Sequence, residues 1–137
     1  MSKIAVVYWS GTGNTEAMAE EIAKACNGEL HKAGDFNVNS VADYDAIAFG
    51  CPSMGAEQLE EGEFEPMFDD VKDKLSGKKI ALFGSYDWGD GEWMRLWQEE
   101  CEGLGANLVA DGLICHLYPD DEALAACQEL GQKLAAE

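Results

Sequence analysis

Four short apolar runs divide the chain and predict the strands of a sheet. They span residues 4–9, 46–51, 80–86 and, more loosely, 108–117. Their apolar residues are continuous rather than alternating, which indicates strands that are covered on both faces, as in a parallel sheet. Residues 29–32 are expected to form a short second strand, and the Asn-, Asp- and Ser-rich segment 35–43 a loop or a weak helical turn.

Segments with helical spacing lie between these runs. Their apolar residues recur every three or four positions, which is the period of one face of an α-helix. The stripes consist of Met18, Ile22 and Cys26; of Phe64, Met67, Phe68, Val71 and Leu75; of Trp93, Trp97, Cys101 and Leu104; and of Ala123, Cys127, Leu130 and Leu134. Gly77 follows the second stripe where a helix-terminating glycine is expected. Strands and helices therefore alternate, which predicts an α/β fold with right-handed crossovers.

Length and charge restrict the function classes. The chain has 137 residues, of which 47% are hydrophobic, and we expect residues 1–137 to form a single domain. Its 9 Lys and Arg residues face 27 Asp and Glu residues, so the formal net charge is −18. This charge excludes the usual electrostatic binding of nucleic acid or anionic lipid, which requires a basic surface. It predicts a soluble monomer that attracts partners with basic surfaces.

The cysteine pattern predicts a cytoplasmic protein. Five widely spaced cysteines contain no C-x-x-C pair, which argues against a zinc site and a disulfide framework, so we expect reduced thiols in the core. No run approaches the roughly 18 apolar residues of a membrane-spanning helix, and no signal peptide precedes the first strand. His31 and His116 have no partner at ligand or catalytic spacing and are interpreted as surface or packing residues. No residue pattern predicts a general base, a nucleophile or a metal site.

A loop rich in hydroxyl groups and glycine follows the first predicted strand. It consists of Ser10, Gly11, Thr12, Gly13, Asn14 and Thr15, and the first helix begins there. Backbone N–H groups and the positive helix end converge at such a loop, and its glycines let the backbone curl around an anion. It is no Walker A loop, which would end in Gly-Lys-Ser/Thr, and Glu16 takes the third glycine position of G-x-G-x-x-G. The loop predicts a phosphate cradle without a cation; the alternative is a structural turn with a hydroxyl cap.

Two further loops are expected at the same edge of the sheet. They span residues 51–57 and 85–91, and ligands of doubly wound sheets bind beyond the carboxyl ends of the strands. Met54 and Trp88 can sandwich a flat aromatic ring, Trp88 by stacking and Met54 by a sulfur contact. Each alone is more often a packing or surface residue. Beside a phosphate cradle, the pair predicts a site for a phosphorylated aromatic cofactor.

Taken together, these motifs resemble those of the short-chain flavodoxins. The resemblance rests on residues 8–16, 51–57, 63–66, 82–86 and 88–94, and it is weakest across 29–44. It implies a five-stranded parallel sheet in the order 2-1-3-4-5 with helices on both faces, and one non-covalently bound FMN. It also implies a low-potential one-electron carrier, not an enzyme, that shuttles electrons between redox enzymes in place of a ferredoxin.

The resemblance implies which residues hold the cofactor. Ser10 to Thr15 would hold the phosphate through hydroxyl and N–H groups. Met54 would cover the inner face of the isoalloxazine ring, and Trp88 would stack on the outer face. The other residues expected in these two loops are Pro52, Ser53, Ser85, Tyr86 and Asp87.

Further contacts to the ring follow from the same resemblance. The peptide between Gly55 and Ala56 would turn its carbonyl toward N5 on one-electron reduction, and Glu57 would accept a hydrogen bond from N3–H. Backbone donors around Trp88 and Gly89 would bind the pyrimidine oxygens. A second electron would add negative charge to a ring without a compensating cation, so this step is expected at low potential, and the protein should stop readily at one electron.

Two residues depart from the family pattern. Asp87 stands where glycine is usual, and its charge is expected to lower the potential for the second electron further. Ala56 stands where glycine or a short polar residue is commoner. If its turn requires a positive φ, the strain costs roughly 1 kcal/mol, or about 40 mV in the potential for the first electron. A higher potential in Ala56→Gly would support this expectation.

Some alternatives stay open. The acidic run between residues 57 and 70 is either a solvated face or a docking rim for basic partners. The chain could also be an FMN-dependent reductase of small molecules, of the quinone reductase type, or a flavin activator of a metal-radical enzyme. A reductase would need a second pocket for its substrate, which the sequence does not indicate.

Overall fold

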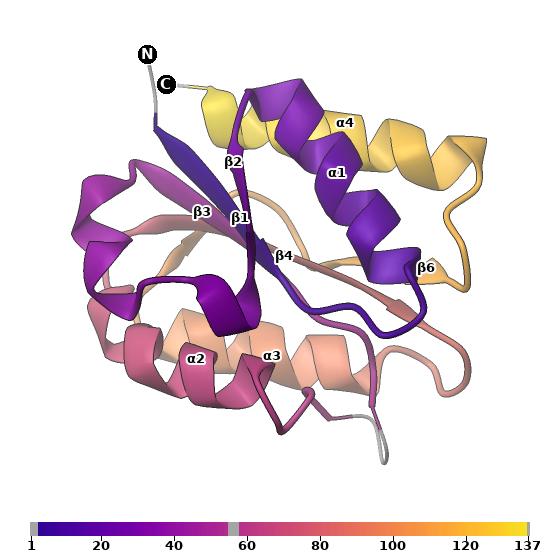
Figure 1. The fold of residues 1–137 in the computed structure, drawn as a ribbon, viewed down its shortest axis with the longest axis horizontal. Helices are drawn as coiled ribbons and strands as arrows, with labels where there is room; N and C mark the ends of the chain where they lie inside the picture. Colours follow the sequence, from indigo (N-terminus) through magenta and orange to yellow (C-terminus); the bar gives the residue numbers. More distant parts are fainter. Residues whose placement is uncertain (1–2, 55–57, 137) are drawn as a thin grey trace.

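A parallel sheet lies between two layers of helices in the computed structural model, which describes residues 3–54 and 58–136. The strands are β1 (Ile4–Tyr8), β2 (Glu29–Lys32), β3 (Ala46–Gly50), β4 (Lys79–Tyr86), β5 (Asn107–Leu108) and β6 (Leu113–His116). The helices are α1 (Asn14–Cys26), α2 (Phe64–Val71), α3 (Glu92–Gly103) and α4 (Asp121–Ala135). Helices α1 and α4 cover one face of the sheet, and α2 and α3 cover the other (Figure 1).

The strand order confirms the predicted topology. The strands follow the order β2-β1-β3-β4-β5, all parallel, and β6 also pairs with β4. The order 2-1-3-4-5 is therefore correct, with two short strands in the fifth position. Because the carboxyl ends of β1, β3 and β4 lie at one edge, the loops that follow them are neighbours.

The two faces of the sheet have different cores. Aromatic side chains fill the space under α2 and α3, where Phe64, Phe68 and Trp97 form edge-on and stacked ring contacts. Smaller side chains fill the space under α1 and α4. There, a Cβ on Gly131 would lie 2.7 Å from the Ile22 carbonyl oxygen, so glycine permits the close approach of the two helices. All five cysteines are buried and free, as predicted.

The segment 35–43, expected as a loop or a weak helical turn, contains the 3₁₀ helix Val38–Asp43, and a shorter 3₁₀ helix, Ala33–Asp35, leads into it. The second apolar stripe exceeds its helix, since α2 ends at Val71 and a 3₁₀ turn, Lys72–Lys74, leads to the buried Leu75. None of the helices in the described ranges has the length and apolarity needed to cross a membrane.

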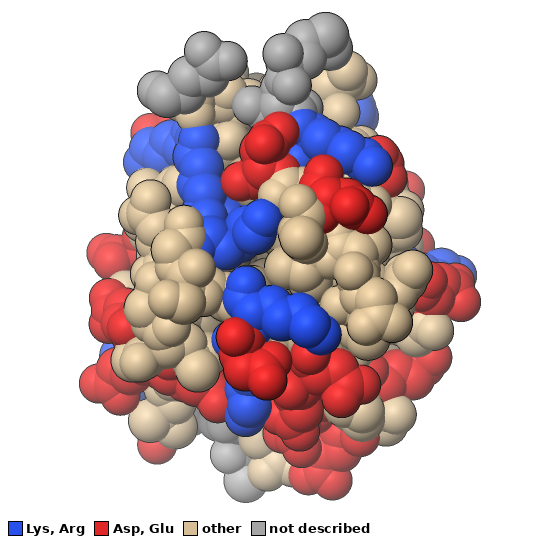
Figure 2. Space-filling model, turned by 90° about the vertical axis from the view of Figure 1, so that its left-hand side faces the viewer, with Lys and Arg blue, Asp and Glu red and all other residues tan. Residues whose placement is uncertain are grey.

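Lysine side chains gather at the end of the molecule where β1, β3 and β4 begin (Figure 2). The Lys78 Nζ atom donates to the Tyr44 carbonyl at 2.5 Å, and the Lys3 ammonium lies 4.9 Å from the centre of the Tyr44 ring. The opposite end, where these strands finish, carries exposed carboxylates such as those of Asp87 and Asp90. The net negative charge is therefore unevenly distributed, with much of the compensating charge far from the loops of interest.

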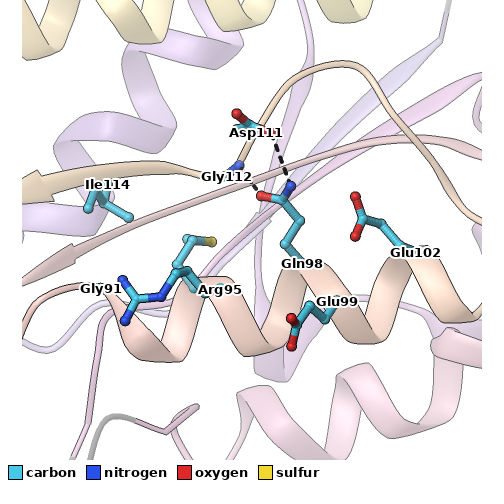
Figure 3. A pocket seen from close by; sticks show the side chains of 9 residues that line it. Gly91, Arg95, Gln98, Glu99, Glu102, Asp111, Gly112 and Ile114 are labelled. Carbon is cyan, nitrogen blue, oxygen red and sulfur yellow. Dashed lines mark hydrogen bonds between the residues drawn. The ribbon is translucent and has the colours of Figure 1, made fainter.

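The predicted strand over residues 108–117 is wrong in one respect, because residues 109–112 interrupt it. The Gln98 side chain of α3 accepts a hydrogen bond from the Gly112 N–H at 2.8 Å and donates to Asp111 Oδ1 at 3.1 Å. A Cβ on Gly112 would lie 2.4 Å from the Met94 sulfur, so the backbone passes close to α3. Figure 3 shows the Gln98 hydrogen bonds. They lie beside a groove of about 440 Å³ between α3 and β6. The backbone binds α3 here instead of continuing the sheet.

Candidate functional site

The three loops that the sequence singles out meet in one cleft of about 150 Å³ at the carboxyl ends of β1, β3 and β4. It is lined by Trp9, Gly11, Thr12, Pro52, Ser53, Met54, Ser85, Tyr86, Asp87 and Trp88. Nine of these ten residues belong to the set predicted from the sequence, and Trp9 is the addition. Ser10 and Gly13 line an adjoining hollow with Trp9 and Gly11, and Lys32 lies on its wall together with Glu16, Asp35 and Glu63.

The loop before α1 is held in shape by its own first residue. The Ser10 Oγ atom accepts hydrogen bonds from the N–H groups of Gly13, at 3.1 Å, and Glu16, at 3.2 Å. Gly13 has a φ of +93°, a backbone conformation that favours glycine. Because Ser10 Oγ uses its lone pairs in these contacts, the hydroxyl proton is left for an external acceptor.

The start of α1 offers further donors. In the described part of the chain, the N–H groups of Thr12, Asn14 and Thr15 have no acceptor. Orphan N–H groups of this kind, at the positive end of a helix, form an anion site. The loop therefore has the donors of the predicted phosphate cradle.

The Thr15 side chain forms hydrogen bonds with Ser85. Its hydroxyl is buried and lies 2.8 Å from Ser85 Oγ, and it also accepts a hydrogen bond from the Ser85 N–H at 3.3 Å. The pair joins the loop before α1 to the end of β4. The hydroxyl is engaged in this pair, so the backbone N–H is the donor that Thr15 retains for an anion.

The loop after β3 is tied to β4 and to the segment before α2. The Ser53 N–H donates to the Ser85 carbonyl at 3.0 Å, and Met54 and Gln58 exchange backbone hydrogen bonds of 2.8 and 2.9 Å. Ser53 Oγ is buried without a hydrogen-bond partner among residues 3–54 and 58–136. An unsatisfied hydroxyl beside a cleft is a binding group for a polar ligand atom.

The expectations for Gly55, Ala56 and Glu57 lie outside the described residues. The redox-dependent peptide, the acceptor for N3–H and the strain at Ala56 therefore stay predictions.

The loop after β4 carries the aromatic residue predicted to stack on a ring. Trp88 is 56% exposed, whereas Trp93, in the first turn of α3, is buried. The Trp93 Nε1–H group donates to the Cys51 carbonyl at 3.2 Å, which fixes the two loops relative to each other. Gly89 has a φ of +88°, so the chain turns sharply after Trp88. An exposed tryptophan on a fixed loop is a suitable stacking surface.

Sequence reasoning gave no site role to Trp9 or His116. A Cβ on Gly11 would lie 3.0 Å from the Trp9 ring, so this ring packs on the glycine of the loop, and its Nε1–H group donates to Glu63 Oε1 at 3.2 Å. His116 lies beside the loop after β4 and contacts the Asp87 carbonyl. The position of Trp9, one residue before the loop, is a signal that the sequence did contain.

The electrostatics of the site favour binding over acid–base chemistry. Burial raises the pKa of the Cys51 thiol to about 12, although the Glu60 N–H group, 3.3 Å from the sulfur, works in the opposite direction. Burial, with a hydrogen bond to Glu16, likewise raises the pKa of Tyr8 to about 12. Both groups are therefore protonated at neutral pH. No cluster of three potential metal ligands occurs in the described ranges.

A flat ring with a phosphate group fits these residues. The N–H groups at the start of α1 and the Ser10 hydroxyl are suited to the phosphate. The Ser53 hydroxyl, which has no partner within the described ranges, is suited to a polar edge of the ring. Met54 and Trp88, which both line the cleft, offer a sulfur and an aromatic face to a planar ring. No lysine or arginine lines the cleft in the described part of the chain.

Comparison with known proteins finds similarity to flavodoxins. The flavodoxin family model matches residues 6–131. The flavodoxin of Megasphaera elsdenii is 46% identical over 137 residues, with 96% of this chain and 98% of that protein covered. The flavodoxin of Clostridium beijerinckii is 47% identical over 135 residues, with 95% and 97% covered. The solution structure of the two-electron reduced Megasphaera elsdenii flavodoxin superimposes with a TM-score of 0.87 over 96% of this chain and 98% of that one.

Proposed function

Because the chain belongs to the flavodoxin family, we propose that it carries single electrons at low potential between redox enzymes, in place of a ferredoxin. Flavodoxins are FMN-binding electron-transfer proteins, and this chain is an FMN-binding electron carrier rather than an enzyme. The observation that carries the proposal is the meeting of the three loops in one cleft. A reductase or an activator of a metal-radical enzyme is not favoured.

The phosphate would be held by the loop from Ser10 to Thr15. Its donors are the Ser10 hydroxyl and the backbone N–H groups at the start of α1, which have no acceptor in the described part of the chain. The Gly11 and Gly13 backbone brings these donors close to the anion. Hydrogen bonds to a charged group are stronger than neutral ones, so these donors would carry most of the binding of the phosphate, although Lys32 lines the same hollow.

The ring would lie between Met54 and Trp88. FMN would supply the redox centre. Pro52, Ser53, Ser85, Tyr86 and Asp87 complete the walls of the cleft, and the N–H groups of Trp88 and Gly89 are available for the pyrimidine edge. Residues that only pack and donate hydrogen bonds suit an electron carrier, because electron transfer needs no proton acceptor from the protein.

A low potential for the second electron follows from the charges. The chain carries a net charge of −18, and no basic side chain lines the cleft among its described residues. Additional negative charge on the ring is therefore disfavoured. The first electron, when accompanied by a proton, adds no charge and is not penalised in this way.

Redox partners would dock through basic surfaces at the acidic end of the molecule. The structure divides the acidic run into two groups. Glu60 accepts hydrogen bonds from the N–H groups of Gly62, Glu63 and Phe64 at 2.7–2.8 Å and so holds the start of α2. Glu65, in the first turn of α2, is exposed, as expected of a docking rim, whereas Asp69, in the last turn of that helix, forms an ion pair with Lys72 at 3.1 Å.

The setting of the protein is part of the proposal. We expect a cytoplasmic monomer that works as one domain, since its net charge of −18 opposes self-association and its five free thiols suit a reducing compartment.

Stepwise anaerobic reduction, followed by visible absorption, tests the proposed function. The FMN-loaded protein should show a two-band flavin spectrum that gives way to a stable one-electron form with broad long-wavelength absorption, before full reduction. Direct passage to the two-electron form would favour the reductase. Protein that fails to take up added FMN would overturn the cofactor site itself.

A further inference from the structure

The loop after β4 is held from the side opposite the cleft by His116, the last residue of β6. The two strands are in register, with Tyr86 opposite His116. The His116 Nε2 atom lies 3.0 Å from the Asp87 carbonyl oxygen. A carbonyl oxygen only accepts hydrogen bonds, so Nε2 carries the proton in this contact.

The imidazole is fixed in this position. Its ring lies 5.1 Å from the Tyr86 ring, centre to centre, and the N–H of the next residue, Leu117, donates to the Tyr86 carbonyl at 2.9 Å. Leu117 adopts a φ of +63°. This conformation costs a non-glycine residue roughly 1–2 kcal/mol, and such strain persists only where surrounding contacts impose it. The chain is strained at the residue that follows the histidine.

The contact with Asp87 determines where the next N–H group points. The Asp87–Trp88 peptide is trans, so its C=O and N–H groups point in opposite directions. Strand β4 lies between β3 and β6, so the cleft is on the side of β4 away from His116. A carbonyl turned toward His116 thus turns the Trp88 N–H toward the cleft side. This N–H has no acceptor among the described residues.

We propose that His116 is a positioning residue for the flavin. By binding the Asp87 carbonyl, it presents the Trp88 N–H as a preorganised donor to the pyrimidine edge of FMN, without touching the cofactor. The proposal rests on FMN binding in the cleft. Preorganisation matters because a donor that is already oriented loses little freedom on binding.

Two substitutions separate the hydrogen bond from the ring contact. His116→Phe keeps a ring against Tyr86 but removes the donor. His116→Gln removes the ring but places an amide N–H at the reach of Nε2. His31→Gln is the control, because His31 contacts Glu29 and Tyr44 on β2 and the loop before β3, away from the cleft.

Fluorescence titration measures the Kd of each protein for FMN and for riboflavin, which has the same ring but no phosphate. We expect His116→Phe to raise the Kd for FMN and the Kd for riboflavin by about fivefold to tenfold each, the effect of one hydrogen bond. His116→Gln and the His31 control should stay within about twofold of the unmodified protein, on the same scale. Equal losses in His116→Phe and His116→Gln would show a packing role and overturn the proposal, as would an unchanged Kd in His116→Phe.

A second measurement does not depend on the variants folding. In the FMN-loaded, unmodified protein, the NMR resonance of the His116 Nε2 proton should show a scalar coupling across the hydrogen bond to the Asp87 carbonyl carbon. An imidazole protonated only at Nδ1 would overturn the proposal. If the titration shows that the unmodified protein binds no FMN, the proposed function is overturned. That result is distinct from the results above that overturn the positioning role of His116.

Discussion

The phosphate loop and the loop after β4 reach the same cleft by different means. The phosphate loop organises itself, since Ser10 accepts the N–H groups of Gly13 and Glu16 within six residues of chain. The loop after β4 depends on distant partners, because His116 holds the Asp87 carbonyl across 29 residues. A local cradle can be recognised from a short motif, whereas a loop held from outside can be recognised only once the strands are placed.

The two regions are joined by the buried hydroxyls of Thr15 and Ser85. Substitutions at this junction, at the residues that would contact the flavin ring, and at nearby charged residues should therefore have separable effects. These effects are on the stability of the fold, the affinity for FMN and the redox potential.

Breaking the junction should have the largest effect. Thr15→Val leaves the buried Ser85 hydroxyl and N–H without their partner. We expect the free energy of unfolding to fall by about 2 kcal/mol, the cost of unsatisfied buried polar groups. Urea unfolding measures this loss, with the exposed Thr12→Val as the control. Equal stability of the two variants would mean that the pair contributes nothing.

Removing the stacking surface should act on the ring end alone. Trp88 is 56% exposed, so Trp88→Ala should leave the stability nearly unchanged. It should weaken FMN and riboflavin equally, by about tenfold, since aromatic stacking contributes roughly 0.5–1.5 kcal/mol beyond area burial. Fluorescence titration with both ligands checks this. Leu96→Ala is the control, since Leu96 is 53% exposed on α3 and does not line the cleft. A selective loss of FMN binding would contradict the assignment of Trp88 to the ring.

The segment that follows the β3 loop should show a pH-dependent stability. Burial works to raise the pKa of Glu60, but three backbone N–H donors outweigh it and lower that pKa. A carboxylate with a lowered pKa stabilises the fold above its unfolded pKa, and the contribution is lost as pH falls through the folded pKa. Glu60→Gln should therefore be less stable near neutral pH, by about 0.5–1 kcal/mol, as for a charge at a helix start. The difference should vanish in acid.

Urea unfolding between neutral and acidic pH measures this profile. Glu20→Gln, at an exposed position in the middle of α1, is the matched control. A Glu60→Gln deficit that persisted unchanged in acid would show that the carboxylate charge is not its cause.

The smallest effect is expected for the charge of Asp87, whose residue is exposed and lines the cleft. At about 10 Å in water, one unit charge contributes about 0.4 kcal/mol, or roughly 20 mV for one electron. Asp87→Asn should raise the potential for the second electron by this amount at low ionic strength, with little change at high salt. Spectroelectrochemistry at two salt concentrations measures it. An unchanged potential at low salt would reject the hypothesis that Asp87 tunes the couple.

Much of the fold could be predicted because its signals are local. Continuous apolar runs marked β1, β3 and β4, and periodic stripes marked the four helices. The interruption after β5 could not be predicted in this way, because it depends on Gln98, a side chain of α3, reaching Gly112. The Asp-Gly pair at 111–112 is the one local turn signal within this interruption.

The candidate site divides in the same manner. The loop from Ser10 to Thr15 could be predicted because its hydroxyl residues and glycines are consecutive in the sequence and directly precede a helix. The buried pairing of Thr15 with Ser85 spans 70 residues, and the contact of His116 depends on the register of β4 and β6. Neither long-range contact leaves a pattern in the sequence.

The division of the cleft into a phosphate end and a ring end is tested most directly by the affinities of Ser10→Ala for FMN and riboflavin. Ser10 has no part in binding the ring in this account. Its loss should weaken FMN by roughly 10- to 100-fold, as expected for a hydrogen bond to a charged group, and leave riboflavin unchanged. An equal loss for both ligands would contradict the account, because the loop before α1 would then not be the phosphate site.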